Sequence, residues 1–263
     1  MHPELGTTLV IAALAAVAAP LGGLIGLWRK PSSLAMSLAL GFASGVLVAT
    51  VAFEMLPKSL DIGSLLLTLA GFACGFLGLW GFDLYIHRGE VAGEGAEEKR
   101  DVARHHRRHG IRGGDKAAVI VGGTLAEEMI EGLSIGVGAA FDPGIGIVVA
   151  SAIVVDNFAV SLSVGELTRE NPEVRGRAEL ARVLRWTGLL GITLFLATLA
   201  GFFVLGRLPL PLLGFSFAAG AGVMFYQTLT DLVPEAEDRH YRRSAGLAAA
   251  AGFLALLAFA EAM

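Results

Sequence analysis

Three glutamates, Glu127, Glu128 and Glu131, interrupt one apolar stretch of the sequence. On a helix, Glu127 and Glu131 are i,i+4 neighbours and Glu128 is three residues from Glu131, so one helix would present a patch of carboxylates. Asp156 and Asn157 interrupt the next apolar stretch at a similar depth. Carboxylate and amide oxygens are hard ligands that suit Mg²⁺, Mn²⁺, Ca²⁺ or Fe²⁺, and Zn²⁺ also accepts them. We therefore expect these five residues to form a divalent-cation site.

Acids in apolar surroundings need something to offset their charge. A charged side chain at the centre of a bilayer costs roughly 2.5 to 3.5 kcal/mol, and neither stretch offers a Lys or Arg as a partner. Alternatively, some of the acids are protonated and hydrogen-bond to their neighbours, which explains one such residue more easily than four. Because burial and crowding favour protonation, we expect the empty site to hold at least one proton near neutral pH and to release protons when a cation binds.

Three more oxygen-bearing side chains could lie on a route to or from this cluster. Ser161 follows Asn157 by about one helical turn, and Glu54 and Asp231 lie near the ends of two other apolar stretches. We expect Glu54 at the outer end and Asp231 near the inner end to act as stations on an ion pathway. An ordinary position at the membrane interface would explain each of these two acids about as well.

The elements that hold these residues are expected to be membrane-spanning helices. Of the 263 residues, 54% are hydrophobic and 17% are charged, against about 25% charged in soluble domains. Charges, Pro and Gly divide the chain into eight apolar segments, each long enough to cross a bilayer as a helix: residues 5–28, 34–57, 62–86, 117–140, 144–166, 184–206, 209–234 and 244–261. We expect an all-α membrane protein with a single transmembrane domain over residues 1–263.

Basic residues predict the orientation. The connections after the first, third, fifth and seventh segments contain 18 of the 20 Lys and Arg residues, and only Lys58 and Arg207 lie on the opposite side. By the positive-inside rule these four connections are cytoplasmic, so both termini lie outside the cell membrane. The longest connection, residues 87–116, contains several histidines and glycines. We expect a flexible cytoplasmic loop that binds metal transiently or, more simply, binds anionic lipid headgroups.

A weak internal repeat relates the second and seventh segments. Phe42-Ala43-Ser44-Gly45 precedes Glu54-Met55-Leu56-Pro57, and Phe217-Ala218-Ala219-Gly220 precedes Asp231-Leu232-Val233-Pro234. The two segments run in opposite directions across the membrane, as in the inverted repeats of secondary transporters. We expect segments 1–3 and 6–8 to form an inverted repeat around segments 4 and 5. Chance is the alternative, because small residues and helix-end prolines are common in membrane helices.

These features resemble the ZIP (Zrt/Irt-like) divalent metal transporters, in particular their bacterial GufA- and ZupT-like branch. The resemblance covers nearly the whole chain, and it implies eight spans with metal ligands on the fourth and fifth. The pieces that carry it are residues 41–45 with 54–57, residues 131–138, and residues 217–220 with 231–236.

The departures from the family pattern fall on the metal ligands. The fourth span of the family usually reads His-Asn-x-Pro-Glu-Gly, and here Glu127 and Glu128 take the His and Asn positions, while Ile130 takes that of Pro. Glu131 is retained. The fifth span of the family usually ends its motif with a glutamate ligand, where this chain has Val160. The resemblance therefore implies a weakened second metal position and a site made of oxygen ligands alone.

The combined expectation is a secondary transporter that moves a divalent cation of the zinc, iron or manganese class into the cytoplasm, with no prosthetic group. The alternatives are a ZIP-derived sensor or non-transporting membrane protein, and a proton-coupled member with altered ion specificity. No metalloprotease, nucleophile-elbow or di-iron motif occurs, so an enzyme is not expected. The expected partners are the cation and the lipid bilayer, not nucleic acid, and a homodimer is left open. Cys74, the only cysteine, is expected to be buried.

Overall fold

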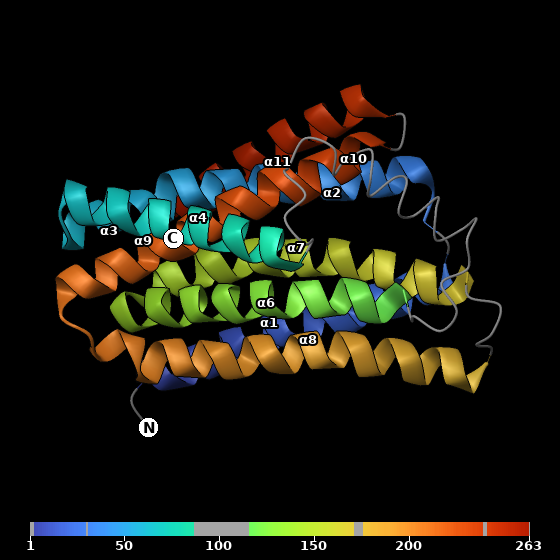
Figure 1. Ribbon diagram of the computed structural model, residues 1–263, viewed down its shortest axis with the longest axis horizontal. Helices are drawn as coiled ribbons and strands as arrows, with labels where there is room; N and C mark the ends of the chain where they lie inside the picture. The colour runs from blue at the N-terminus through green and yellow to red at the C-terminus, as the bar shows by residue number, and fades with distance from the viewer. Residues whose placement is uncertain (1–2, 30, 87–115, 171–175, 239–240, 263) are drawn as a thin grey trace.

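The computed structural model describes residues 3–29, 31–86, 116–170, 176–238 and 241–262, and all regular secondary structure in them is helical. The helices form long rods that run along one bundle (Figure 1). The rods are α1 (Pro3–Trp28); α2 (Ser33–Ala49), continued by η1 (Thr50–Met55) and α3 (Leu56–Ile62); α4 (Leu65–Ile86); α6 (Lys116–Phe141); α7 (Pro143–Glu170); α8 (Arg177–Phe203), followed by η2 (Leu205–Arg207); α9 (Leu210–Gln227), continued by η3 (Thr228–Leu232) and α10 (Val233–Asp238); and α11 (Arg242–Ala262).

The rods agree with the expected membrane spans. Seven of them are long and apolar enough to cross a membrane. The other long rod in the described part of the chain, α6, has 26 residues and differs from these seven in carrying three glutamates within its apolar stretch. Helix α8 begins at Arg177, earlier than the predicted limit of residue 184, because its polar first turns continue the helix beyond the apolar segment. The predicted loop at 87–116 lies outside the described residues, except for Lys116 at the start of α6.

The rods pack in three sets. Helices α1, α6, α7 and α8 form a central group, in which α1 and α6 each contact both α7 and α8. Helix α2 pairs with α11, and α4 pairs with α9; α2 then contacts α7, and α9 contacts α6. This pattern of contacts is symmetric. If α1, α2 and α4 are exchanged with α8, α9 and α11 in that order, and α6 with α7, the same helices remain in contact.

Glycines allow these rods to approach closely. On α6, an added Cβ would lie 2.5 Å from the Leu194 carbonyl oxygen at Gly132 and 2.1 Å from that of Thr198 at Gly136, so α8 leaves no room for a side chain. The α1–α7, α2–α11 and α4–α9 contacts are equally close at Gly22, Gly26, Gly41, Gly45, Gly71 and Gly75. Such small-residue contacts are typical of helices that pack within a membrane.

Two rods contain a π-helical segment at corresponding places. Segment η1 carries Glu54 and η3 carries Asp231, and Pro57 and Pro234 each follow two residues after the segment. A π-helical turn shifts the regular i→i−4 hydrogen bonds, and proline removes one backbone donor altogether. Both acids that the sequence suggests as pathway stations therefore lie where the helix is irregular, and such segments often occur at functional sites.

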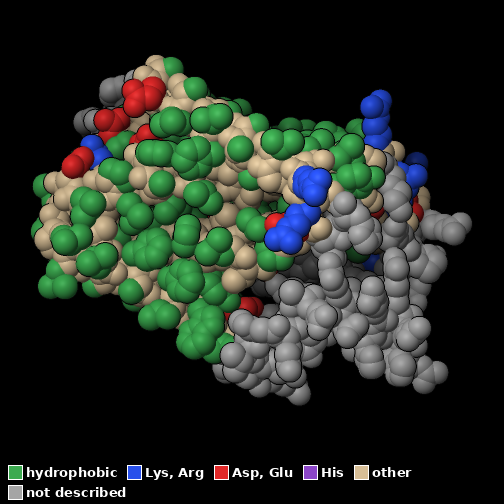
Figure 2. Space-filling model, turned by 90° about the horizontal axis from the view of Figure 1, so that it is seen from above, with side chains coloured by type: hydrophobic (Ala, Val, Ile, Leu, Met, Phe, Trp, Pro, Cys, Tyr) green, Lys and Arg blue, Asp and Glu red, His purple; other side chains and the backbone are tan. Residues whose placement is uncertain are grey.

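The surface of the bundle suits a lipid environment. Figure 2 shows hydrophobic side chains over much of the visible face, with most of the visible Lys and Arg side chains in its right half. Cys74 on α4 is exposed, so the expectation that it is buried was wrong. Only 17% of the apolar stretch of α4 is buried inside the bundle, and most of this helix faces outward, including Cys74.

Candidate cation site

Two of the three α6 glutamates are buried. Glu128 and Glu131 each expose 1% of their surface, whereas Glu127 is half-buried. Their spacing of three and four residues puts all three side chains on neighbouring parts of one helical face. That face meets α7 and α9.

Helix α7 contributes the second part of the cluster. Asp156 is fully buried and Asn157 exposes 3% of its surface. The Asn157 Nδ2 group donates a hydrogen bond of 2.9 Å to Glu128 Oε2, which ties α7 to α6. Asp156 is close enough to Glu131 to interact with it electrostatically. The α6–α7 contact thus brings together candidate ligands from two separate segments of the sequence.

Other acids dominate the electrostatic surroundings of this cluster. Glu128 interacts with Asp156 and Glu127, and Glu131 interacts with all three of these acids. Asp156 also interacts with Asp231 on η3. Within the described residues, no Lys or Arg is among the principal electrostatic neighbours of Glu128, Glu131 or Asp156. Negative charge at this density in a low-dielectric interior is unfavourable unless a cation or protons offset it.

Several buried oxygens of the cluster have no hydrogen-bond partner. They are Glu131 Oε1, both carboxylate oxygens of Asp156 and the Ser161 hydroxyl oxygen. Ser161 exposes only 1% of its surface, so water does not reach it freely either. An unpaired buried polar group typically costs about 1–3 kcal/mol. Coordination to a cation would satisfy these oxygens.

The carboxylates do not converge on one point. Across the described ranges, no three His, Cys, Asp or Glu side chains come close enough together to form a metal-binding group. A cation at this site would therefore require the carboxylates to turn toward it. Amide or hydroxyl oxygens would be needed to complete its ligand shell.

Gln227 at the end of α9 joins the cluster and was not predicted from the sequence. It exposes 3% of its surface, and its Nε2 group donates a hydrogen bond of 3.2 Å to Glu127 Oε2. Gln227 also interacts with Glu131, while its own Oε1 atom has no hydrogen-bond partner. The only signal in the sequence was a single amide in an apolar segment, four residues before Asp231.

The two suggested pathway acids have different surroundings. Asp231 is close enough to Asp156 to interact with it, and the Thr230 hydroxyl donates to its carboxylate at 3.3 Å. Glu54 is partly buried and interacts electrostatically with Lys58 and Asp142 at the α3 end of the bundle. Asp231 thus adjoins the buried cluster, whereas Glu54 lies at the α3 end of the bundle.

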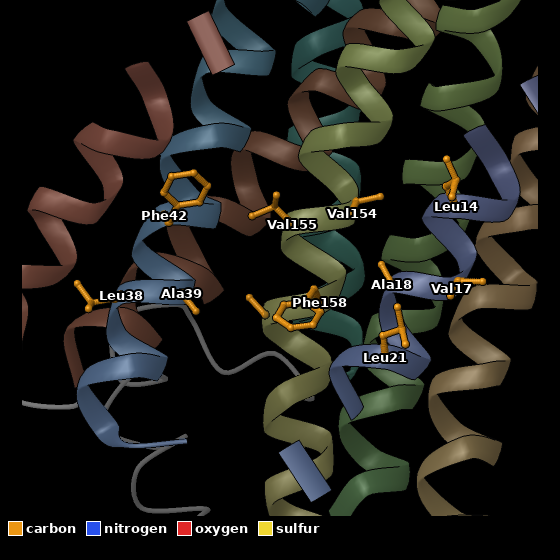
Figure 3. Close-up of a pocket in the computed structure, with 11 residues that line it drawn as sticks. Leu14, Val17, Ala18, Leu21, Leu38, Ala39, Phe42, Val154, Val155 and Phe158 are labelled. Atoms are coloured by element: carbon orange, nitrogen blue, oxygen red, sulfur yellow. The ribbon is translucent and has the colours of Figure 1, made fainter. Parts of the chain in front are cut away.

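A cavity of about 600 Å³ lies next to the cluster but is unsuited to a cation (Figure 3). It lies between α1, α2 and α7, and every residue that lines it is apolar: Leu14, Val17, Ala18, Leu21, Leu38, Ala39, Phe42, Val154, Val155, Phe158 and Ala159. The flanking positions on α7, Asp156 and Asn157, are not part of this lining. The polar cluster and the apolar cavity therefore occupy different faces of α7.

Comparison with known proteins finds distant relatives over most of the chain. The zinc transporter ZupT of Salmonella typhimurium is 25% identical over 236 residues, which cover 88% of this chain and 86% of the relative. The zinc transporters ZupT of Salmonella typhi and Salmonella newport match to the same extent. No protein-family model matches the chain. The chain is thus a distant homologue of ZupT, which confirms the resemblance to the bacterial branch of the ZIP family and the expectation that it is not an enzyme.

Proposed function

We propose that this distant homologue of the ZupT transporters carries a divalent cation across the cell membrane and into the cytoplasm. The cation binds within the α6–α7 cluster at Glu127, Glu128, Glu131, Asp156 and Asn157. Homology supports the general class of membrane metal transporter. The position of the binding site and the direction of transport are proposed in addition to this class.

One observation carries the site: buried acidic oxygens on two facing helices lack hydrogen-bond donors. Glu131 Oε1 and both carboxylate oxygens of Asp156 have no hydrogen-bond partner, and the charged groups around them are further acids. A purely structural role would leave these atoms unsatisfied at a cost of about 1–3 kcal/mol each. A divalent cation offsets the negative charge and supplies the missing interactions at once.

The ligand types restrict the ion. The site offers carboxylate, amide and hydroxyl oxygens, and none of its residues provides an imidazole or a thiolate. Such donors suit hard ions such as Mn²⁺, Mg²⁺, Ca²⁺ and Fe²⁺, and Zn²⁺ binds them less selectively than it binds His or Cys. We expect the substrate to come from the manganese, iron or zinc class.

The ion enters past Glu54 and leaves past Asp231. Support for this route comes from the irregular segments: each acid lies on a π-helical turn, and Asp231 interacts electrostatically with Asp156. The positive-inside pattern puts Glu54 on the outer side and both termini outside. Ser161 lies about one turn beyond Asn157 on α7 and offers a hydroxyl oxygen to the departing ion.

An inverted repeat accounts for the arrangement around the site. The rods pair as α1 with α7 and α8 with α6, and as α2 with α11 and α9 with α4. A two-fold relation between α1, α2 and α4 on one side and α8, α9 and α11 on the other would produce this pattern, with α6 and α7 exchanging places. Transporters built in this way bind their substrate near the midplane between the halves.

Uptake by purified protein tests the proposal. Proteoliposomes would be supplied with radiolabelled Mn²⁺, Zn²⁺, Fe²⁺ or Ca²⁺ and compared with liposomes that lack protein. The proposal predicts protein-dependent uptake of at least one of these ions. Metal binding in detergent without uptake of any ion would contradict transport and favour the metal-sensor alternative.

A further inference from the structure

Gln227 enters the cluster from an anchored helix end. It is the last residue of α9, directly before the π-helical segment η3. Its neighbour Tyr226 donates a hydrogen bond of 2.9 Å to Asp83 Oδ2 on α4, and the Tyr226 ring packs edge-on against Phe76. These contacts hold the end of α9 against α4. The position of Gln227 is therefore determined by its helix as well as by its own hydrogen bonds.

The amide of Gln227 is satisfied on one side only. Its Nε2 group donates to Glu127 Oε2 at 3.2 Å, and the side chain also interacts with Glu131, so the amide lies near two carboxylates of α6. Its Oε1 atom is buried and has no partner. Oε1 and Nε2 are bonded to the same carbon, so Oε1 lies beside the cluster, and a rotation of the amide brings it toward the carboxylates. The unsatisfied oxygens of the cluster thus come from three rods.

We infer that Gln227 is a cation ligand and a specificity-determining residue of this site, contributed by α9. The inference rests on the proposed function and adds an oxygen ligand that the resemblance to the family does not imply. Val160 stands where that resemblance implies a glutamate ligand on α7. The amide oxygen of Gln227 restores one oxygen donor to a site whose own acids do not converge.

The chemistry of the amide predicts a preference. A neutral carbonyl oxygen is a hard donor of the kind that Mn²⁺ and Ca²⁺ accept in protein sites, whereas Zn²⁺ gains more from imidazole or thiolate. The Gln227 Nε2 group also keeps Glu127 and Glu131 oriented before the ion arrives, as outer hydrogen-bond partners of metal ligands commonly do. Removing the amide should therefore weaken Mn²⁺ binding more than Zn²⁺ binding.

Calorimetric titration of the full-length protein in detergent tests the inference with Mn²⁺ and Zn²⁺. Gln227→Met keeps the length of the side chain but replaces the amide by a thioether, which donates no hydrogen bond and is a poor ligand for Mn²⁺. It should weaken Mn²⁺ binding by about tenfold or more, and Zn²⁺ binding by less. Gln227→Glu keeps an oxygen at the same reach and should retain Mn²⁺ binding within about threefold. Met224→Leu, a buried change on the same helix, is the matched control and should bind both ions like the wild type.

The outcomes separate this inference from the proposed function. If the wild-type protein bound neither ion, the proposed function itself would fail. If the wild type bound Mn²⁺ and Gln227→Met bound it equally well, Gln227 would not be a ligand and only the inference would be lost. Equal weakening for both ions, with no rescue by Gln227→Glu, would indicate a merely structural role and would also overturn it. Should the Met variant fail to fold, the Glu variant decides, because loss of Mn²⁺ binding there contradicts an oxygen ligand at this position.

Discussion

Glu127 occupies the position at which the family pattern has a histidine, and its surroundings differ from those of the other acids. It is half-buried, and Gln227 donates to its Oε2 atom at 3.2 Å, whereas Glu128 and Glu131 are fully enclosed. A partly open position with an adjustable partner can accept a different ligand type without creating a buried unpaired charge. Glu127 is therefore the residue at which ion preference can be changed with least damage to the fold.

Glu127→His should shift the preference toward zinc. Imidazole is a softer ligand than carboxylate, so the ratio of Zn²⁺ to Mn²⁺ affinity should rise by about tenfold. Competition between the two ions for binding to the purified variant measures this ratio. An unchanged ratio would mean that the side chain at position 127 does not touch the ion.

Lys58 is a positive charge near Glu54 at the α3 end of the bundle. Its ammonium group lies 4.4 Å from the centre of the Phe141 ring, and Glu54 interacts electrostatically with it and with Asp142. On the proposed route, an approaching divalent cation meets Glu54, whose charge Lys58 already offsets in part.

Lys58→Met should strengthen the attraction of the α3 end of the bundle for cations. Interactions of partly exposed charges are worth about 0.2–1 kcal/mol, so the KM for uptake should fall by about 1.4- to fivefold at low ionic strength. Salt screens such interactions, and the difference should shrink at high ionic strength. Arg207→Met, which removes the other basic residue expected on that side, is the control. A KM that Lys58→Met leaves unchanged at low salt would place the route of entry elsewhere.

At the scale of elements, the site depends on how closely α6 approaches α8. A Cβ at Gly136 would lie 2.1 Å from the carbonyl oxygen of Thr198 and 2.6 Å from the backbone nitrogen of Phe202. Both are backbone atoms, so no side-chain rotation can relieve the contact. A residue larger than glycine must push the two helices apart, and α6 would carry its glutamates with it.

Gly136→Ala should therefore destabilise the bundle and impair the site together. Overpacking of this kind costs about 1–3 kcal/mol, and each kcal/mol lowers the Tm by about 2–4 °C in a protein of this size. Gly188→Ala on α8 is the matched control, since an added Cβ there meets nothing within 4 Å. Thermal unfolding of both variants in detergent checks the prediction, and equal Tm values would show that the close approach is not needed.

The irregular parts of the helices could not be predicted from the sequence. Apolar length identified the segments, because a membrane span needs about 20 residues whatever its neighbours are. The π-helical segments at Thr50–Met55 and Thr228–Leu232 leave no such signature, although Pro57 and Pro234 mark their neighbourhood. Whether a helix before a proline stays regular depends on which other rods can satisfy its backbone, and local sequence does not contain that information.

At the scale of the whole molecule, the site was predictable where one helix determines it. Spacing alone grouped the glutamates of α6, and a shared depth in the membrane linked them to Asp156 and Asn157. Gln227 lies 100 residues from Glu127 along the chain, and it joins them only because α9 packs against α6. Contacts of this kind arise from the packing of the rods, which the apolar pattern does not specify.

The crowded acids also predict that protons move when the cation binds. Four carboxylates in one low-dielectric region cannot all be ionised cheaply, so the empty site should hold protons that a divalent cation expels. Affinity should then fall as the pH is lowered, because protons compete with the ion for the same oxygens. Calorimetric binding of Mn²⁺ in two buffers of different ionisation enthalpy measures the release directly.

The apparent enthalpies should differ between the two buffers for the wild type. They should differ less for Glu128→Gln, which removes one of the groups that can carry a proton. Identical apparent enthalpies for the wild type would show that no protons leave, and the expected link between metal binding and proton release would be lost.

The central claim is that the carboxylates between α6 and α7 bind the transported ion, and Glu131 tests it most directly. This side chain is fully buried, lies beside Asp156 and has an oxygen without a partner. The measurement is the initial rate of metal uptake into proteoliposomes by Glu131→Gln, with Glu261→Gln at the exposed end of α11 as the control. The account predicts that Glu131→Gln loses most of the uptake while the control keeps it. Uptake at the wild-type rate by a correctly folded Glu131→Gln protein would contradict the account.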